Sequence, residues 1–181
     1  MYALDAVIAQ GIPTLITPFL TAVFISLTHL GDWHVIISFT LIVSGYYMLT
    51  HRPTYVYLLA TLMLACIVVL GLKFAIGRPR PDIAQLILVG SADTSFPSWH
   101  AALSLTFYGY LAYLYISASV RTHRRLLVIS LTTILIWIVG FSRIYLGVHW
   151  LSDIVAGWLI GLCVLVPMIT FSQKKLYNTK A

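Results

Sequence analysis

Residues 142–153 place an arginine, a histidine and an aspartate, Arg143, His149 and Asp153, in a segment that apolar sequence flanks on both sides. If the chain is helical from about residue 149, His149 and Asp153 share one face, because side chains four positions apart lie one turn apart. The carboxylate would then hold one imidazole tautomer and leave the other ring nitrogen able to attack an electrophile. The planar guanidinium of Arg143 suits a tetrahedral oxyanion. The segment predicts a nucleophile, an orienting carboxylate and an anion clamp; a purely structural His–Asp hydrogen bond is the alternative.

A second cluster contains three basic residues at the end of an apolar run. Lys73 lies near the end of that run, and Arg78 and Arg80 follow it in a loop where they alternate with Pro79 and Pro81. Proline reduces the entropy that is lost when a loop is held in one shape, which favours a preformed anion clamp. For Arg78 the alternative is that the side chain extends to lipid head groups.

A third cluster, residues 95–100, has the pattern of a helix start. Pro97 and Ser98 fit the first turn of a helix, where the backbone amides, including that of Trp99, lack intrahelical partners. An anion can bind these amides, and the positive end of the helix dipole favours it. His100 would lie beside that anion, where it could protonate a departing oxygen, although an isolated histidine near a membrane surface is more often structural.

The composition places these clusters in a membrane protein. The 181 residues are 60% hydrophobic and 9% charged, with a mean hydropathy of +0.95, whereas soluble domains have roughly a quarter of their residues charged. The formal net charge of +6 arises largely from short basic loops, so lipid head groups and lipid phosphates, and not nucleic acids, are the expected partners. Cys66 and Cys163 lie in apolar runs and are interpreted as small core residues.

The elements that must position the clusters are apolar helices. The sequence predicts an all-α polytopic membrane protein, a six-transmembrane-helix bundle that forms one domain over residues 1–181, with its site motifs within 73–153. The spans are expected at about 13–29, 34–50, 54–76, 97–118, 126–144 and 149–171. Residues 1–12 are interpreted as a short interfacial helix, and the first span as retained after synthesis because no secretory cleavage site is recognisable. The spacing of Gly157 and Gly161 predicts close approach of another helix.

Alternating spans give the two membrane faces different charges. One face receives a group of basic residues and, by the positive-inside rule, is expected to be cytoplasmic together with both termini. Its basic residues are Arg52, Arg121, Arg124, Arg125, Lys174, Lys175 and Lys180. The opposite face receives the polar turn at residues 29–34 and all three clusters. Cations on that face require another explanation, and an anion site supplies one.

The three clusters together match the needs of phosphoryl transfer through a covalent intermediate. Such a reaction needs charge neutralisation on the phosphate oxygens, a nucleophile in line with the leaving group, and an acid for the leaving oxygen. Apart from Asp82 and Asp93 in the loop, no second carboxylate is expected near Asp153 to hold a metal ion with it. No metal and no other cofactor is expected, because lysine and arginine can supply the electrostatic stabilisation.

The three clusters resemble the motifs of the type 2 phosphatidic acid phosphatase family, the membrane lipid-phosphate phosphatases related to vanadium haloperoxidases. Lys73, Arg80 and Pro81 match the first family motif, a lysine followed after six residues by Arg-Pro. Residues 97–100, Pro-Ser-Trp-His, match the second motif, in which glycine usually stands where this chain has Trp99. The third motif is intact as Ser142, Arg143, His149 and Asp153.

The resemblance implies a role for each matched residue. His149 would attack phosphorus to form a phosphohistidine, Asp153 would orient it, and His100 would protonate the leaving oxygen and then activate water. The phosphate would be held by Lys73, Arg80, Ser98, Arg143 and the backbone amide of Trp99. Trp99 puts the identity of the substrate in question more than the chemistry, since its ring must either face lipid or line the pocket.

Three functions follow from these patterns. The first is hydrolysis of a lipid phosphate or diphosphate at the outer face of a bacterial inner membrane, with undecaprenyl pyrophosphate, phosphatidylglycerophosphate, phosphatidate and lipid A phosphates as candidate substrates. The second is a phosphotransferase that passes the phosphoryl group to another lipid, and the third is a non-catalytic transporter or anion-binding membrane protein. The sequence leaves the choice of lipid and the oligomeric state open.

Overall fold

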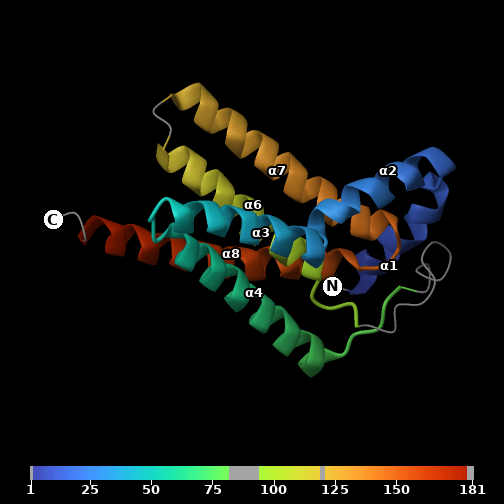
Figure 1. Cartoon of the computed structure of the whole chain (residues 1–181). Helices are drawn as coiled ribbons and strands as arrows, with labels where there is room; N and C mark the ends of the chain where they lie inside the picture. Colours follow the sequence, from blue (N-terminus) through green and yellow to red (C-terminus); the bar gives the residue numbers. More distant parts are fainter. Residues whose placement is uncertain (1, 82–93, 119–120, 179–181) are drawn as a thin grey trace.

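The computed structural model describes the backbone of residues 2–81, 94–118 and 121–178, and every regular element in these ranges is helical. The helices are α1 (Tyr2–Gly11), α2 (Pro18–Thr28), α3 (Trp33–Leu49), α4 (Thr54–Ile76), α6 (Trp99–Ala118), α7 (Thr122–Tyr145) and α8 (Leu151–Asn178), with short 3₁₀ turns η1 (Ile12–Leu15) and η2 (His29–Gly31) (Figure 1). The expected all-helical class is confirmed. A helix is present within residues 1–12, as expected, while its position at the membrane surface stays a prediction.

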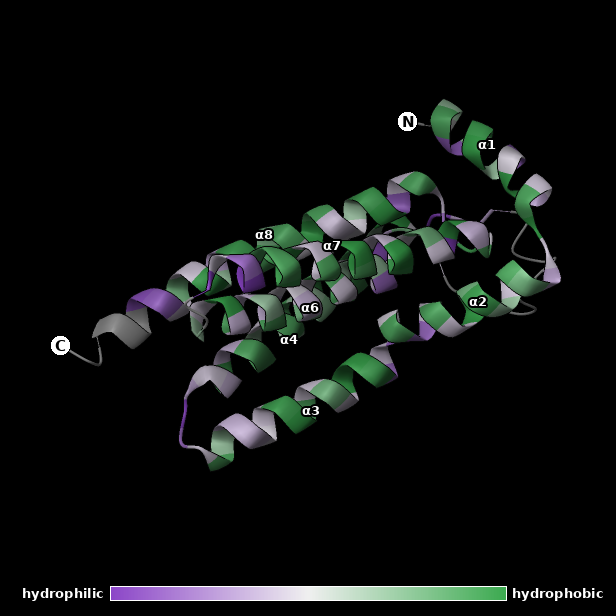
Figure 2. Ribbon diagram, turned by 90° about the horizontal axis from the view of Figure 1, so that it is seen from above, coloured by the Kyte–Doolittle hydropathy of each residue, from purple (hydrophilic) through white to green (hydrophobic). Residues whose placement is uncertain are grey.

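Four of the helices are long and apolar enough to cross a bilayer by themselves. They are α4, α6, α7 and α8, with 20 to 24 residues in each apolar segment, and roughly 20 helical residues span the ~30 Å hydrocarbon core. Hydrophobic residues make up most of the length of the long helices, whereas hydrophilic residues gather towards their ends (Figure 2). Many of the large apolar side chains on these helices are exposed. Met63, for example, is 65% exposed on the outer face of α4. These surfaces are explained by contact with lipid.

The expectation of six separate spans is not confirmed. The two spans expected at 13–29 and 34–50 correspond to α2, with 11 residues, and α3, with 17 residues, and the two helices are bent by 44° at a short break. Eleven helical residues cover only about 16 Å, roughly half of the hydrocarbon thickness. The two helices therefore count as at most one bent span, which gives four or five spans in the described residues.

This difference also corrects the expected placement of the N-terminus. In the structure, α1 and the C-terminal end of α8 lie at opposite ends of the bundle. Asp5 of α1 is hydrogen-bonded to Ser152 in the first turn of α8, while the C-terminal end of α8 lies at the far left in Figure 1. The two termini therefore do not share a face, because the turn at residues 29–32 does not separate two complete crossings.

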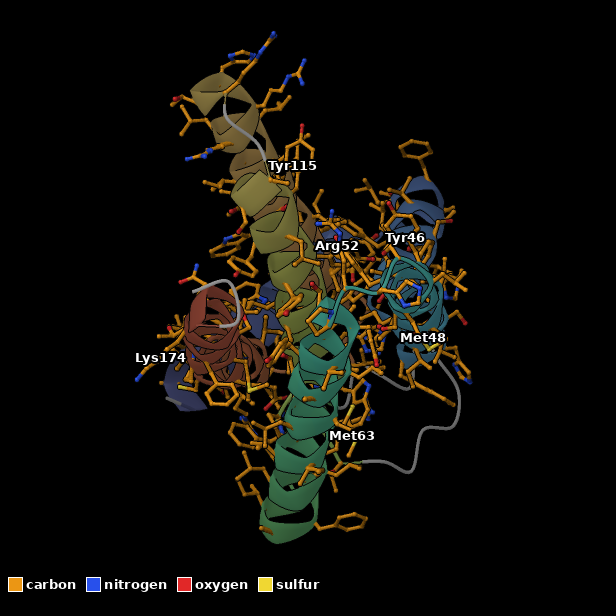
Figure 3. All side chains as sticks on the ribbon, turned by 60° about the vertical axis from the view of Figure 1, so that its left-hand side comes forward. Tyr46, Met48, Arg52, Met63, Tyr115 and Lys174 are labelled. Atoms are coloured by element: carbon orange, nitrogen blue, oxygen red, sulfur yellow. The ribbon has the colours of Figure 1, made fainter. Side chains whose placement is uncertain are left out.

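The helices gather their ends as the alternating pattern predicted. The first residues of α3, α6 and α8 and the last residues of α4 and α7 meet at one end of the bundle, called the site end below. The opposite end carries Arg52, Lys174 and the other described basic residues that were expected on the cytoplasmic face, and it is called the basic end. Figure 3 turns this end towards the viewer, with Arg52 and Lys174 labelled.

Close packing of α6 against α8 forms the centre of the bundle. Leu103, Phe107 and Tyr110 of α6 are each about 1% exposed. A Cβ atom added to Gly157 would lie 2.7 Å from the carbonyl oxygen of Ser98 and 2.8 Å from the Cβ of Ala101. The prediction of close approach at Gly157 and Gly161 is confirmed, with α6 as the partner.

This contact generates a stability prediction. Gly157→Ala is expected to destabilise the protein by about 1–3 kcal/mol, because the new methyl group overlaps backbone atoms of α6 that cannot move independently. Thermal unfolding in detergent is the measurement. Gly45→Ala in α3 is the matched control, since nothing lies within 4 Å of its added Cβ. Equal melting temperatures for the two variants would contradict the packing argument.

Candidate active site

A cavity of about 410 Å³ opens at the site end and brings residues of all three sequence clusters together. It is lined by Trp33, Leu70, Lys73, Phe74, Gly77, Arg80, Thr94, Trp99, His100, Arg143 and His149. Six of the eight predicted site residues are in this set: Lys73, Arg80, Trp99, His100, Arg143 and His149. The other two, Asp153 and Ser98, lie behind the lining.

His149 lies in the turn between α7 and α8, and its orientation follows from two short-range features. Gly147 adopts a positive φ of 69°, which glycine permits without strain and which lets the chain reverse after α7. Nδ1 of His149 then lies 3.4 Å from Oδ2 of Asp153. This contact is longer than an ordinary N–H···O hydrogen bond, and catalytic contacts commonly shorten when substrate binds. Nε2 is the nitrogen that remains for chemistry in the cavity that His149 lines.

Asp153 is held in place by stronger contacts than the one to the histidine. Its Oδ2 accepts a 2.9 Å hydrogen bond from the amide of Trp150, and its Oδ1 accepts a 2.7 Å bond from Nη1 of Arg78. The carboxylate is completely buried. The ion pair with Arg78 therefore compensates a charge that would be costly to bury alone.

Arg78 joins the N-terminal helix to this pair, a role that neither sequence interpretation of the residue anticipated. Its Nη2 donates to Oδ2 of Asp5 at 2.8 Å, and its guanidinium carbon lies 5.3 Å from the ring centre of Trp150. Asp5 also accepts a hydrogen bond from the amide of Ser152, at the positive end of α8. Burial raises the pKa of Asp5, but hydrogen bonds from Arg78 and Ser152 outweigh this effect and hold the pKa below its usual value.

The second histidine also has a carboxylate partner. Nε2 of His100 lies 2.7 Å from Oδ1 of Asp32, and Oδ2 of the same aspartate lies 2.6 Å from Nδ1 of His29. Asp32 follows η2, so the break between α2 and α3 carries it to the site. Sequence reasoning placed Asp32 in a polar turn only; its position between His29 and His34 was the one available signal.

The three cations reach the cavity from different elements. Lys73 of α4 donates to the carbonyl oxygen of Thr94, and Nη1 of Arg80 donates to the carbonyl oxygen of Val148 at 2.9 Å. Nη1 of Arg143 in α7 donates to Oγ1 of Thr28 at 2.8 Å. The buried Nε of Arg143 has no hydrogen-bond partner within the described residues. An anion in the cavity would satisfy such a donor.

Of Ser98 and Trp99, only Trp99 lines the cavity, which is one of the two positions expected for its ring. Ser98 is fully buried, and its hydroxyl accepts a long hydrogen bond, 3.4 Å, from the amide of Ala101. Its side chain is therefore used at the start of α6 and does not line the cavity. Trp99 lines the cavity, so its ring does not simply face lipid, and its φ is negative. The replacement of the family glycine therefore does not strain the backbone.

Two further carboxylates lie at the site, but each is paired with a side chain of the protein. Asp5 shares Arg78 with Asp153, and Asp32 is bonded to His100. Nevertheless, no group of three or more histidine, cysteine or acidic residues with metal-binding geometry occurs in the part of the chain that the structure describes. Asp82 and Asp93 lie outside the described residues.

The electrostatic environment keeps His149 neutral. Burial is the main cause that lowers its pKa, Arg143 and Arg80 lower it further, and Asp153 raises it only in part, so the pKa falls to about 3. A neutral imidazole retains the lone pair that a nucleophile needs.

We therefore expect His149 not to titrate between about pH 5 and 8, a range in which an ordinary histidine does. The unfolded chain binds a proton at this residue below about pH 6.5 that the folded chain does not bind. Its contribution to folding free energy therefore becomes less favourable as the pH falls, and His149→Gln should weaken the acid destabilisation. Nitrogen NMR of labelled histidine is the direct measurement, and a His149 signal that titrates near pH 6.5 would contradict it.

Comparisons with known proteins agree with this geometry. Phosphatidylglycerophosphatase B of Bacillus subtilis is 31% identical over 174 residues, which cover 94% of this chain and 84% of the relative. The crystal structure of a transmembrane PAP2-type phosphatidylglycerolphosphate phosphatase from Bacillus subtilis superposes with a TM-score of 0.85 at 26% identity, covering 96% of this chain and 86% of the other. LpxE of Aquifex aeolicus has the same fold, with a TM-score of 0.67 at 21% identity over 93% of this chain and 94% of its own.

The family resemblance inferred from the motifs is also confirmed over most of the sequence. Residues 54–177 match the PAP2 superfamily, a range that runs from the start of α4 almost to the end of α8 and contains all three clusters. The chain belongs to the PAP2 superfamily.

Proposed function

We propose that this protein is a lipid phosphatase that hydrolyses a phosphomonoester or pyrophosphate of a membrane lipid through a phosphohistidine at His149. The observation that carries the proposal is the shared cavity, which is lined by two histidines and by the three cations Lys73, Arg80 and Arg143. These groups come from α4 and the loop after it, α6, α7 and the α7–α8 turn. A purely structural role for each would not require them to meet in one cavity.

In the first step, Nε2 of His149 would attack phosphorus, and the bond between phosphorus and the leaving oxygen would break. His100 would transfer its proton to that oxygen, which leaves as an alcohol or as a lipid phosphate. The cations would stabilise the charge on the three remaining phosphate oxygens. In the second step, water would attack the phosphohistidine, His100 would take back one proton, and free phosphate and neutral His149 would result.

The apolar part of the cavity supports a lipid substrate. Trp33, Leu70 and Phe74 line it beside the cations, and Phe74 is 86% exposed. A charged head group could thus contact the cations while its hydrocarbon chains remain beside α4. The Bacillus relative favours phosphatidylglycerophosphate among the candidates.

The orientation follows from charge. With the basic end in the cytoplasm, the site end and α1 would face the cell exterior or periplasm. The test uses a variant that lacks Cys66 and Cys163 and carries one new cysteine, either Thr14→Cys or His123→Cys. An impermeant thiol reagent added to intact cells should label the cysteine at position 14. It should label the cysteine at position 123 only after the cells are permeabilised. Both positions are exposed, one at each end of the bundle. The reverse labelling pattern would contradict the proposed orientation.

The decisive assay is release of phosphate from a panel of lipid phosphates in detergent, with and without a chelator. We expect wild-type protein to release free phosphate without an acceptor lipid and with equal activity in chelator, because the cations replace a metal ion. Loss of activity in chelator would overturn the metal-free mechanism. Phosphate release only with an acceptor lipid would identify a phosphotransferase.

His149→Ala is the matched variant for the covalent step. It should lower turnover by roughly 10⁶-fold, comparable to removal of the nucleophile in other covalent enzymes, and should prevent labelling of the protein by radioactive phosphate. His123→Ala, at the basic end, is the control. A folded His149→Ala protein with full biological function would support the transporter alternative and overturn the phosphatase.

A further inference from the structure

The contacts of the turn at residues 29–32 assign a role to Asp32 that lies outside the three family motifs. We propose that Asp32 is the positioning carboxylate of His100: it holds a proton on Nε2, so that His100 acts on the substrate and on water through Nδ1. This inference rests on the proposed function, since it specifies how the second histidine of the same site performs its two steps.

The geometry of the pair carries the first step of the argument. The 2.7 Å contact between Nε2 of His100 and Oδ1 of Asp32 is that of a strong hydrogen bond to an ionised acceptor. A carboxylate cannot donate, so the hydrogen lies on Nε2 and the neutral imidazole has its lone pair on Nδ1. No hydrogen bond to Nδ1 occurs within the described residues, and His100 lines the cavity. Nδ1 is therefore the nitrogen available to the reacting atoms.

The chain around Asp32 is fixed against α6 and α7, which makes the contact more than a chance approach of a surface side chain. The hydroxyl of Tyr108 donates to the carbonyl oxygen of Leu30 at 2.7 Å. A Cβ atom on Gly31 would lie 2.5 Å from Val139 and 3.0 Å from Cδ2 of His100. Only glycine lets the turn approach the imidazole this closely. The two residues that precede Asp32 thus hold the turn against α6 and α7.

Charge gives the second step. During the reaction His100 alternates between imidazole and imidazolium in a site that already contains Arg80 and Arg143, and a further positive charge there is unfavourable. The charged or titratable groups around it are Asp32 and His29 from the α2–α3 turn, Lys73 from α4, Arg80 from the following loop, Arg143 from α7 and His149 before α8. Asp32 is the carboxylate in direct contact, so it supplies the counter-charge.

Both proton steps then run through one atom. In the first step Nδ1–H of the imidazolium gives its proton to the leaving oxygen as that oxygen separates from phosphorus. In the second step the lone pair on Nδ1 takes a proton from the attacking water, and the imidazolium is restored. Asp32 keeps the Nε2 hydrogen bond throughout. The two His–Asp pairs would thus use different ring nitrogens. His100 contacts Asp32 through Nε2, whereas His149 contacts Asp153 through Nδ1.

Asp32→Asn tests the proposal without disturbing the helix start. Asp32 precedes α3 and makes no side-chain capping bond, and asparagine is an equally good residue at that position. When phosphatidate is the substrate, the leaving group is an alkoxide that must be protonated. In Asp32→Asn, kcat for this substrate should therefore fall by roughly 10²-fold with little change in KM. Asp32→Glu restores the carboxylate and should recover part of that loss.

An aryl phosphate separates the two steps. The leaving oxygen of p-nitrophenyl phosphate needs little protonation, so the first step should survive in Asp32→Asn while activation of water remains slow. A burst of nitrophenolate followed by slow turnover, with accumulation of labelled phosphohistidine, is expected. Wild-type turnover on both substrates, or an equal loss on both without a burst, would overturn the proposal. A merely structural role predicts that second outcome.

A third measurement keeps this inference separable from the proposed function. If the wild type releases no phosphate from any substrate, the phosphatase proposal fails, but the tautomer of His100 can still be measured. Nitrogen NMR should find the hydrogen on Nε2 in the wild type and a loss of that preference in Asp32→Asn. An unchanged tautomer in the variant would overturn the role of Asp32.

Discussion

The close contact between the first turns of α6 and α8 is the constraint on which the site depends. Gly157 lets the backbone of α6 come within van der Waals distance, and the amide of Ser98 donates to the carbonyl oxygen of Asp153 at 3.1 Å. This fixes His100, two residues after Ser98, relative to the turn that carries His149. A one-methyl change at Gly157 would act on both histidines, because their separation is set by backbone contacts and not by flexible side chains.

The sequence was sufficient for the part of the site that depends on local spacing. His149 and Asp153 lie four residues apart, and Lys73, Arg80 and Arg143 lie next to apolar runs whose ends had to meet at one membrane face. Their convergence in the cavity follows from topology alone. Ser98 is not in the lining, and its side chain has a local alternative: at a helix start, a serine hydroxyl can accept a hydrogen bond from a backbone amide of the same turn.

Residues that reach the site from distant segments could not be inferred in the same way. Asp5 and Arg78 are 73 positions apart, and their ion pair depends on how α1 folds back against α8. Neither has a spacing that identifies its partner. The signal was only that a charged residue in an apolar segment requires compensation, which indicates that a partner exists but not which one. The sequence did not reveal the second His–Asp pair for the same reason, since Asp32 and His100 are 68 positions apart.

The bent α2–α3 pair shows why hydropathy overcounted the spans. Two apolar stretches separated by a polar turn have the pattern of two crossings, and nothing in that pattern reveals that the turn is used inside the site. In the structure Thr28 binds Arg143, Leu30 binds Tyr108 and Asp32 binds His100. A broken helix exposes backbone groups that a bilayer cannot satisfy, so the break is stable only where protein contacts replace them. The same contacts that make the break tolerable therefore deliver its polar residues to the histidine and the arginine of the cavity.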